Sequence, residues 1–150
     1  MSTLHTNTAS GAITRMEDMG VEPFLLSSSL LGVLSQRLVR TLCNSCKEGH
    51  IADERECELL GVPFDNAPTI YRAVGCEECN FNGYRGRTGI HELLVVDETI
   101  REMIHSGKGE QSVEKYIRKR SPSIRQDGCS RVLAGKTTLE EVLRVTREEG

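Results

Sequence analysis

Apolar residues in the first part of the chain recur at helical spacing and predict two helices. Residues 10–19 form a short amphipathic segment that is followed by a glycine. In the segment 23–42, leucines recur every four residues, at positions 30, 34 and 38. Positions four apart lie on one face of a helix, so the pattern predicts a long helix over 23–42 with one apolar face.

Three further segments are predicted as strands. Residues 1–5 have the pattern of a buried strand that ends in a polar loop, and residues 69–74 alternate apolar and polar side chains. Residues 90–96 form the third strand, and we expect it to pair with 69–74. Glycines punctuate the segment 82–89, which predicts a turn before that strand. A short helix is predicted over 53–60, because a glycine and a proline follow it.

The last third of the chain is predicted to be helical. Helices are expected over 98–105, 111–120, 123–134 and 139–148. Thr138 and Glu141 have the spacing of a capping box, which opens the final helix.

One short motif in this region resembles part of a phosphate-binding loop. Gly135-Lys136-Thr137 matches the end of that loop, but Ser130 stands where the motif needs its first glycine. A helical pattern also precedes it, whereas such a loop follows a strand. Gly135 is therefore predicted to end a helix.

Composition excludes several classes of function. The chain has 150 residues, a net charge of −3 and a pI of 5.8, so it lacks the positive field that binds duplex nucleic acid. Three Phe, three Tyr and no Trp are too few for a base-stacking surface. No stretch approaches the roughly 20 consecutive apolar residues of a transmembrane helix. We therefore expect no nucleic acid as a partner and no direct membrane insertion.

Four of the six cysteines form two CxxC pairs, Cys43 with Cys46 and Cys76 with Cys79. Two thiolates three residues apart reach one metal ion, and two such pairs supply the four ligands of a closed tetrahedral zinc site. No signal-peptide pattern follows Met1, which favours a reducing compartment and argues against disulfides. The pairs therefore predict a structural zinc site, with an iron–sulfur cluster or a redox dithiol as alternatives.

The spacing of the cysteines adds detail to this prediction. The 29 residues between the pairs, 47–75, exceed the roughly 15–20 of the commonest zinc-ribbon pattern, so we expect them to form a small subdomain. Cys57 and Cys129 occur singly in helical patterns and are expected to be small buried side chains.

Several motifs occur in an order that resembles one known family. They are Ser2-Thr3-Leu4-His5-Thr6-Asn7, Gln36-Arg37-Leu38, the two CxxC pairs and Gly83-Tyr84-Arg85-Gly86-Arg87. Together they resemble the C-terminal part of the type II secretion ATPases, the cytoplasmic motors of bacterial secretion systems, which are related to the pilus-assembly ATPases. The resemblance extends from Met1 to the end of the chain.

The resemblance implies an α/β fold in three parts. Residues 1–42 would be the last strand and helices of a RecA-like ATPase core. Residues 43–80 would be a tetracysteine zinc-binding subdomain with a small β-hairpin, and 81–150 a strand followed by a mostly α-helical region. The family's P-loop, its acidic magnesium-binding segments and its arginine-bearing N-terminal domain would precede Met1. We therefore expect a fragment or the product of an incomplete gene model, inactive on its own.

The resemblance also implies roles for individual residues. His5 would lie near the nucleotide phosphates as a catalytic residue, and the four paired cysteines would bind zinc. Arg85 and Arg87, beside glycines that permit close approach, would reach a nucleotide or a neighbouring subunit.

For the intact protein the resemblance implies a cytoplasmic ATPase that couples ATP hydrolysis to pseudopilus assembly. It would use ATP and magnesium, form a homo-oligomer that we expect to be a hexamer, and attach to the inner membrane through secretion-platform proteins. Two other interpretations fit the cysteines without the resemblance. One is a stand-alone zinc-ribbon adaptor that binds protein or nucleic acid, and the other is a thiol redox protein.

Overall fold

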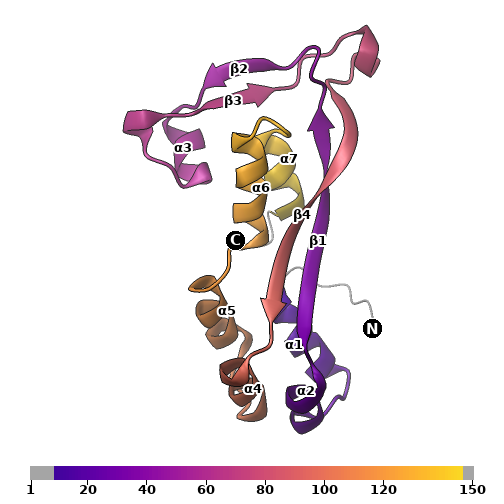
Figure 1. Ribbon diagram of the computed structural model, residues 1–150, viewed down its shortest axis with the longest axis vertical. Helices are drawn as coiled ribbons and strands as arrows, with labels where there is room; N and C mark the ends of the chain where they lie inside the picture. The colour runs from indigo at the N-terminus through magenta and orange to yellow at the C-terminus, as the bar shows by residue number, and fades with distance from the viewer. Residues whose placement is uncertain (1–8, 147–150) are drawn as a thin grey trace. The chain divides into compact units, whose positions relative to one another are not determined.

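The computed structural model describes residues 9–146 and combines helices with strands (Figure 1). The α-helices are α1 (Ala9–Asp18), α2 (Pro23–Ser29), α3 (Glu54–Leu60), α4 (Glu98–His105), α5 (Glu110–Arg118), α6 (Ile124–Leu133) and α7 (Leu139–Thr146). The strands are β1 (Gly32–Leu42), β2 (Glu48–Ile51), β3 (Thr69–Arg72) and β4 (Tyr84–Val95), and two 3-10 turns are η1 (Phe64–Asn66) and η2 (Glu77–Cys79). The predicted α/β class is confirmed. The strand predicted over 1–5 lies outside the described residues.

The chain divides into two compact units. Among the described residues, the first unit comprises 9–36 and 91–123, and the second comprises 37–90 and 124–146. β1 pairs with β4, and each of these strands contributes residues to both units. No helix within residues 9–146 has both the length and the apolar composition to span a bilayer.

The first unit has an apolar core to which α1, α2, α4 and α5 all contribute. Its buried apolar side chains are Ala9, Ile13, Leu26, Leu94, Val96, Ile100, Ile104, Val113 and Ile117. α4 begins at an N-cap, because Asp97 Oδ1 accepts a hydrogen bond from the Ile100 N–H at 2.9 Å. The helices predicted over 98–105 and 111–120 are present as α4 and α5, with ends that differ by at most two residues.

The second unit has its own apolar core, which β1, β3, α3, α6 and α7 share. Its buried apolar side chains are Val39, Ala52, Cys57, Leu60, Ile70, Ile90, Ile124, Cys129, Val132, Leu139 and Val142. α3 begins at a capping box between Asp53 and Glu56 and ends at Gly61, whose φ is +73°. Cys57 and Cys129 are both buried in this core, as predicted.

The prediction of one long helix over 23–42 is wrong. α2 ends at Ser29, and β1 begins at Gly32. A spacing of four residues is also a multiple of the two-residue repeat of a strand, so the leucines lie on one face in either structure. Leu34 and Leu38 lie on the outer face of β1, 62% and 49% exposed, whereas Val39 is fully buried; Leu30 precedes the strand and packs against the core of the first unit.

Two further predictions about strands need correction. The segment 69–74 does contain β3, but β3 pairs antiparallel with β2, with Glu48 opposite Arg72 and Ile51 opposite Thr69 (Figure 1). The predicted partner, 90–96, instead belongs to β4, which pairs with β1. β4 begins at Tyr84, so most of the turn predicted over 82–89 is strand. Glycines here interrupt the side-chain pattern without ending the strand, even at Gly86, whose φ is +82°.

The C-terminal helices agree with their sequence signals. α6 is followed by Gly135, whose φ of +76° is the left-handed conformation of a helix end. α7 then begins where Thr138 Oγ1 accepts a hydrogen bond from the Glu141 N–H at 3.2 Å. The segment 135–137 therefore connects two helices of the second unit.

Candidate functional site

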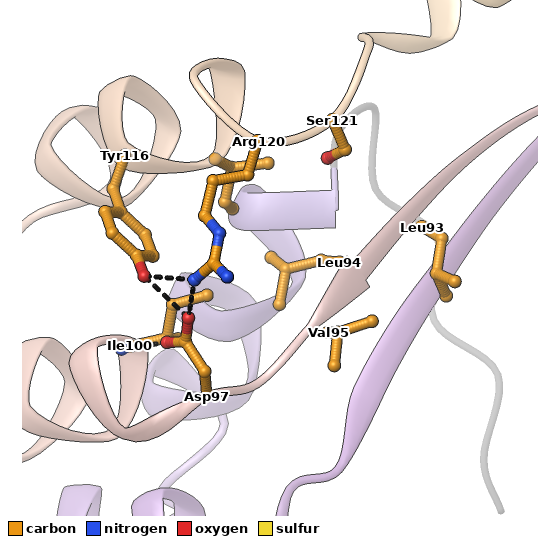
Figure 2. A pocket seen from close by; sticks show the side chains of 9 residues that line it. Leu93, Leu94, Val95, Asp97, Ile100, Tyr116, Arg120 and Ser121 are labelled. Atoms are coloured by element: carbon orange, nitrogen blue, oxygen red, sulfur yellow. Dashed lines mark hydrogen bonds and ion pairs between the residues drawn. The ribbon is translucent and has the colours of Figure 1, made fainter.

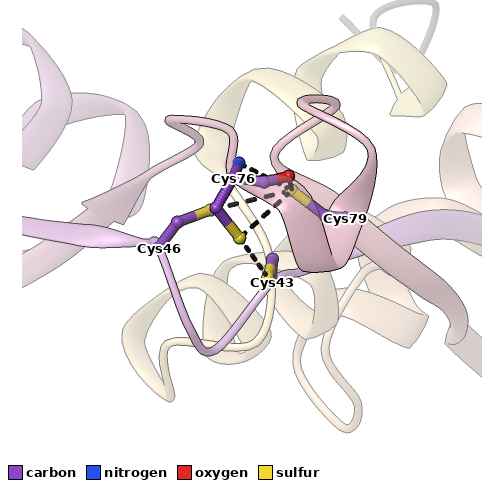
Figure 3. Close-up of side chains that lie close together, drawn as sticks. All are labelled: Cys43, Cys46, Cys76 and Cys79. Carbon is purple, nitrogen blue, oxygen red and sulfur yellow. Dashed lines mark hydrogen bonds between the residues drawn. The ribbon is translucent and has the colours of Figure 1, made fainter.

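The sulfurs of Cys43, Cys46, Cys76 and Cys79 lie together in the second unit, all within 4.8 Å of one another (Figure 3). Cys43 comes directly after the last residue of β1, so a strand presents the first pair and not the predicted helix. The second pair lies around η2, where Cys76 precedes the turn and Cys79 ends it. The Cys43 N–H donates to the Gly83 carbonyl at 3.0 Å, which joins the first pair to the chain after the second.

The distances between the sulfurs fit one tetrahedral metal ion. The Sγ atoms are 3.8 Å apart for Cys43 and Cys76, for Cys46 and Cys79, and for Cys76 and Cys79. Four sulfurs about 2.3 Å from a central zinc lie about 3.8 Å from each other. Disulfide sulfurs would lie about 2.05 Å apart, and all four cysteines are free. The donor set is therefore suited to a zinc ion.

Backbone N–H groups donate hydrogen bonds to two of the four sulfurs, those of Cys46 and Cys79, and each such bond favours the thiolate form. Gly75 donates to Cys46 Sγ at 3.3 Å, and Gly83 donates to Cys79 Sγ at 3.2 Å. Both glycines have positive φ, +115° and +85°. A Cβ on Gly75 would lie 2.9 Å from the Phe81 carbonyl oxygen, so these positions need glycine for conformation and for space.

The cysteine pKa values respond to these contacts. Burial raises the pKa of Cys79, but the N–H groups of Cys76 and Gly83 outweigh it and lower this pKa to about 6. Burial raises the pKa of Cys46 to about 11, and hydrogen bonds with the neighbouring thiols act in the same direction. A divalent cation at the centre would favour deprotonation of all four thiols.

Three arginines line an open concavity of about 500 Å³ elsewhere in the second unit. Arg40 comes from β1, Arg87 from β4 and Arg144 from α7. Arg40 and Arg144 both bind the carboxylate of Glu141, which is buried, at 2.8 and 2.9 Å. Arg87 is exposed and forms no ion pair within residues 9–146. The concavity therefore has the charge and the donors to bind an anionic group.

Of the other two residues predicted for a nucleotide site, the structure describes only Arg85. Arg85 is exposed on β4 and does not line this concavity. His5 lies outside the described residues. Arg40 and Arg144 could not be predicted from the sequence, because neither stands beside a glycine motif and their common partner, Glu141, is 101 residues from Arg40.

A smaller concavity of about 230 Å³ lies in the first unit and is mainly apolar (Figure 2). Leu93 and Val95 of β4 line one side of it. On the other side, Asp97 accepts hydrogen bonds from Arg120 and from the Tyr116 hydroxyl, the latter at 2.6 Å. These bonds tie α5 to the start of α4, and no motif in the sequence predicted this cluster.

Comparisons with known proteins agree with the resemblance found in the sequence. Residues 1–144 match the family described as "Type II/IV secretion system protein". The chain is 62% identical over 149 residues to "Type II secretion system protein E" of Aeromonas hydrophila, covering 99% of this chain and 30% of that protein. It is 62% identical over 148 residues to "Type II secretion system ATPase E" of Vibrio cholerae serotype O1, covering 99% and 29%.

A solved structure shares the fold. The crystal structure of the pilus retraction motor PilT with bound ADP has a TM-score of 0.60 and 23% sequence identity, covering 95% of this chain and 31% of that chain. The present chain thus spans about 30% of the length of the curated relatives that it matches. Because the family match extends over residues 1–144, this chain belongs to the type II/IV secretion system protein family.

Proposed function

We propose that this chain is the C-terminal segment of a cytoplasmic ATPase that energises type II protein secretion. The observation that carries the proposal is the 62% identity, over almost the whole chain, to a relative named as a type II secretion system ATPase. A stand-alone zinc adaptor would share only the cysteine-bearing region with this family, whereas the match covers residues 1–144. In the longer protein, ATP binding and hydrolysis would be coupled to pseudopilus assembly.

Cys43, Cys46, Cys76 and Cys79 hold a structural zinc ion in this proposal. Four thiolates fill a tetrahedral zinc, so no position remains for water or substrate and the ion takes no part in hydrolysis. Its contribution is a cross-link between the end of β1 and the turn before β4. That cross-link stabilises the short β2–β3 pair, since a two-stranded sheet is marginal by itself.

Three residues serve the nucleotide site of the intact protein. His5 donates a hydrogen bond to the phosphates as charge develops in the transition state, and Arg87 offers its guanidinium to an anionic oxygen. Arg85 acts as a second, more exposed cation. The P-loop and the carboxylates that hold magnesium come from the region that the relatives have and this chain does not span.

Within the intact ATPase, the chain would divide functionally into three segments. Residues 1–42 complete a RecA-like core, 43–80 form the zinc subdomain, and 81–150 form the strand and helices that follow. The protein acts as a homo-oligomer, a hexamer, on the cytoplasmic side of the inner membrane. It is held there by secretion-platform proteins and not by its own insertion.

ATP hydrolysis by a chimera tests the proposal. The present chain replaces the matched C-terminal part of the Vibrio cholerae ATPase, with which it shares 62% identity. We expect the purified chimera to hydrolyse ATP within about tenfold of the parent, and each part alone to show no turnover above a buffer blank. A chimera that folds, binds zinc and assembles as the parent does but lacks activity would contradict the proposal. Turnover by the present chain alone would contradict it too.

A further inference from the structure

The concavity of about 500 Å³ in the second unit is lined by three arginines and two apolar residues. Arg40, Arg87 and Arg144 come from three different elements, and Leu38 and Val39 form the rest of the lining. No carboxylate from the described part of the chain is among these residues. The volume lies within the roughly 300–1,000 Å³ of small-molecule sites, so the concavity has room for a small anion and the charge to attract one.

Two of the three guanidinium groups are held in place by a single buried carboxylate. Glu141, whose side chain is 2% exposed, binds Nη2 of Arg40 at 2.8 Å and Nη2 of Arg144 at 2.9 Å. Arg40 also lies over the Tyr84 ring, 4.1 Å from its centroid. Because these contacts already order both side chains, a ligand would lose little conformational entropy in binding them.

All three arginines keep donors that a ligand could use. The side chains of Arg40 and Arg144 are 45% and 52% exposed despite their contact with Glu141. Arg144 uses Nε and Nη2 for that contact, and its Nη1 has no hydrogen-bond acceptor within residues 9–146. The guanidinium of Arg87 is exposed and has no partner at all in the same range. A guanidinium donates several N–H groups in one plane, so these side chains can bind several oxygens at once.

The balance of charge favours a phosphate group over a carboxylate. Three cations share one buried carboxylate, which leaves two positive charges without a buried counter-ion. Glu140 also acts electrostatically on Arg40, but it is exposed, so water and salt screen it. A phosphate group carries about −1.5 to −2 charges and three acceptor oxygens, whereas a carboxylate carries one charge and two oxygens. The phosphate therefore matches both the charge and the number of donors.

We propose that this concavity is a phosphate-binding site, in which Arg87, Arg40 and Arg144 bind the oxygens and Glu141 positions the last two. Its ligand class is a phosphate chain, which a nucleotide and a free polyphosphate have in common. The inference shares Arg87 with the function proposed above, but it goes beyond that function. It rests on the geometry of the concavity, and it requires neither a P-loop nor hydrolysis.

Isothermal titration calorimetry with inorganic pyrophosphate tests the inference on the zinc-loaded chain, in the absence of magnesium. We expect one site per chain with a Kd below about 1 mM at low salt. Arg87→Ala and Arg144→Ala should each weaken binding about tenfold, because each removes a charge-assisted hydrogen bond. Arg87 has no ion pair to lose, and Arg144→Ala leaves Glu141 paired with Arg40, so both variants should fold.

The matched control is Arg72→Ala, which removes the same charge from an exposed position of the second unit. Arg72 pairs with Glu48 and does not line the concavity, so this variant should bind pyrophosphate within about twofold of wild type. Far-UV circular dichroism and zinc content show whether each variant is folded.

Two further titrations identify the ligand more closely. ATP that binds no more than about threefold tighter than pyrophosphate would show that the site recognises the phosphate chain alone. Tighter binding of ATP would show that the nucleoside contributes and that the phosphates are those of a nucleotide. Tricarballylate, which carries three carboxylates, should bind about tenfold more weakly than pyrophosphate, and equal binding would overturn the choice of phosphate.

Two other results would overturn the site itself. One is a folded, zinc-loaded chain that shows no saturable binding of pyrophosphate. The other is equal affinity in wild type and in the Arg87→Ala/Arg144→Ala double variant. None of these titrations depends on hydrolysis, so the site can be refuted while the chimera is active. An inactive chimera would contradict the proposed function and leave the site intact.

Discussion

Glu141 and Arg40 lie 101 residues apart in sequence and form a three-point contact in the second unit. The buried Glu141 carboxylate accepts hydrogen bonds from Arg40 Nε at 2.9 Å, from Nη2 at 2.8 Å and from the Arg40 backbone N–H at 2.9 Å. Arg40 also lies over the Tyr84 ring, 4.1 Å from its centroid. The contact thus joins β1 and β4 to the first turn of α7.

The stability of the second unit should depend on pH through Glu141. Burial raises the pKa of this carboxyl, but hydrogen bonds from Arg144 and Arg40 outweigh it and lower the pKa to about 2 from an ordinary value of 4.5. A lowered folded-state pKa stabilises the protein fully above the unfolded value, and this stabilisation is lost as pH falls from about 4.5 to 2. Glu141→Gln should cost about 1–3 kcal/mol at pH 7, measured by urea unfolding.

The difference in unfolding midpoint between wild type and Glu141→Gln should be constant above pH 5 and narrow below pH 4.5. Zinc dissociates from both proteins as thiols protonate, so the difference isolates the carboxyl group. Glu140→Gln changes an exposed neighbour on the same helix and serves as the control. A difference that is unchanged at pH 3 would show that Glu141 is not the responsible group.

Zinc content should depend on one cysteine from each pair. Cys43→Ser/Cys76→Ser removes two ligands whose sulfurs are 3.8 Å apart, so the protein should retain less than about a tenth of the single zinc expected per chain. Cys57→Ala/Cys129→Ala changes the two buried cysteines outside the cluster and should retain that zinc. Elemental analysis of the purified proteins measures both, and stoichiometric zinc in the first variant would refute the ligand assignment.

Gly83 and Gly86 offer a matched test of the backbone beside the four paired cysteines. Their φ values are +85° and +82°, but a Cβ on Gly83 would lie 2.7 Å from the Ala73 Cβ, whereas Gly86 faces open space. Gly86→Ala should cost about 1 kcal/mol, from the left-handed conformation alone. Gly83→Ala adds overpacking and should cost about 2–4 kcal/mol. Equal costs in urea unfolding of the zinc-loaded protein would mean that Gly83 does not constrain the site.

Arg87 and Arg85 differ in their surroundings, so replacing each of them should change nucleotide affinity by a different amount. Only Arg87 lines the concavity that also contains Arg40 and Arg144. In the chimera, Arg87→Ala should weaken nucleotide binding about tenfold, as expected for the loss of one charge-assisted hydrogen bond, and Arg85→Ala should have a smaller effect. Fluorescent-nucleotide titration measures both affinities. If Arg87→Ala leaves the nucleotide affinity unchanged, this concavity is not part of the nucleotide site.

Local signals in the sequence predicted local structure well. The end of α3 at Gly61 and the end of α6 at Gly135 were predictable, because each depends on a glycine that adopts positive φ. The gathering of the four paired cysteines was predictable too, since one ion requires all four donors at one place. The identity of the ion stays a prediction.

The incorrect predictions of secondary structure came from sequence patterns that fit both a helix and a strand. Leucines four apart fit a helix and a strand equally, although Val33, Val39 and Thr41 favour a strand. No pattern in the sequence predicted the pairing of β3 with β2, because the residues of β2, Glu48–Ile51, do not alternate clearly between apolar and polar side chains. The contact between Arg40 and Glu141 depends on the folded chain as a whole and was not predictable from spacing.

Secretion by living cells tests the central claim most directly. The chimera is expressed in Vibrio cholerae cells that lack their own type II secretion ATPase, and the secreted fraction of a type II substrate is measured in the medium. We predict that the chimera restores secretion, that His5→Ala abolishes it, and that Glu48→Gln does not affect it. A stable, zinc-loaded chimera that hydrolyses ATP at the parental rate and restores no secretion would contradict the account.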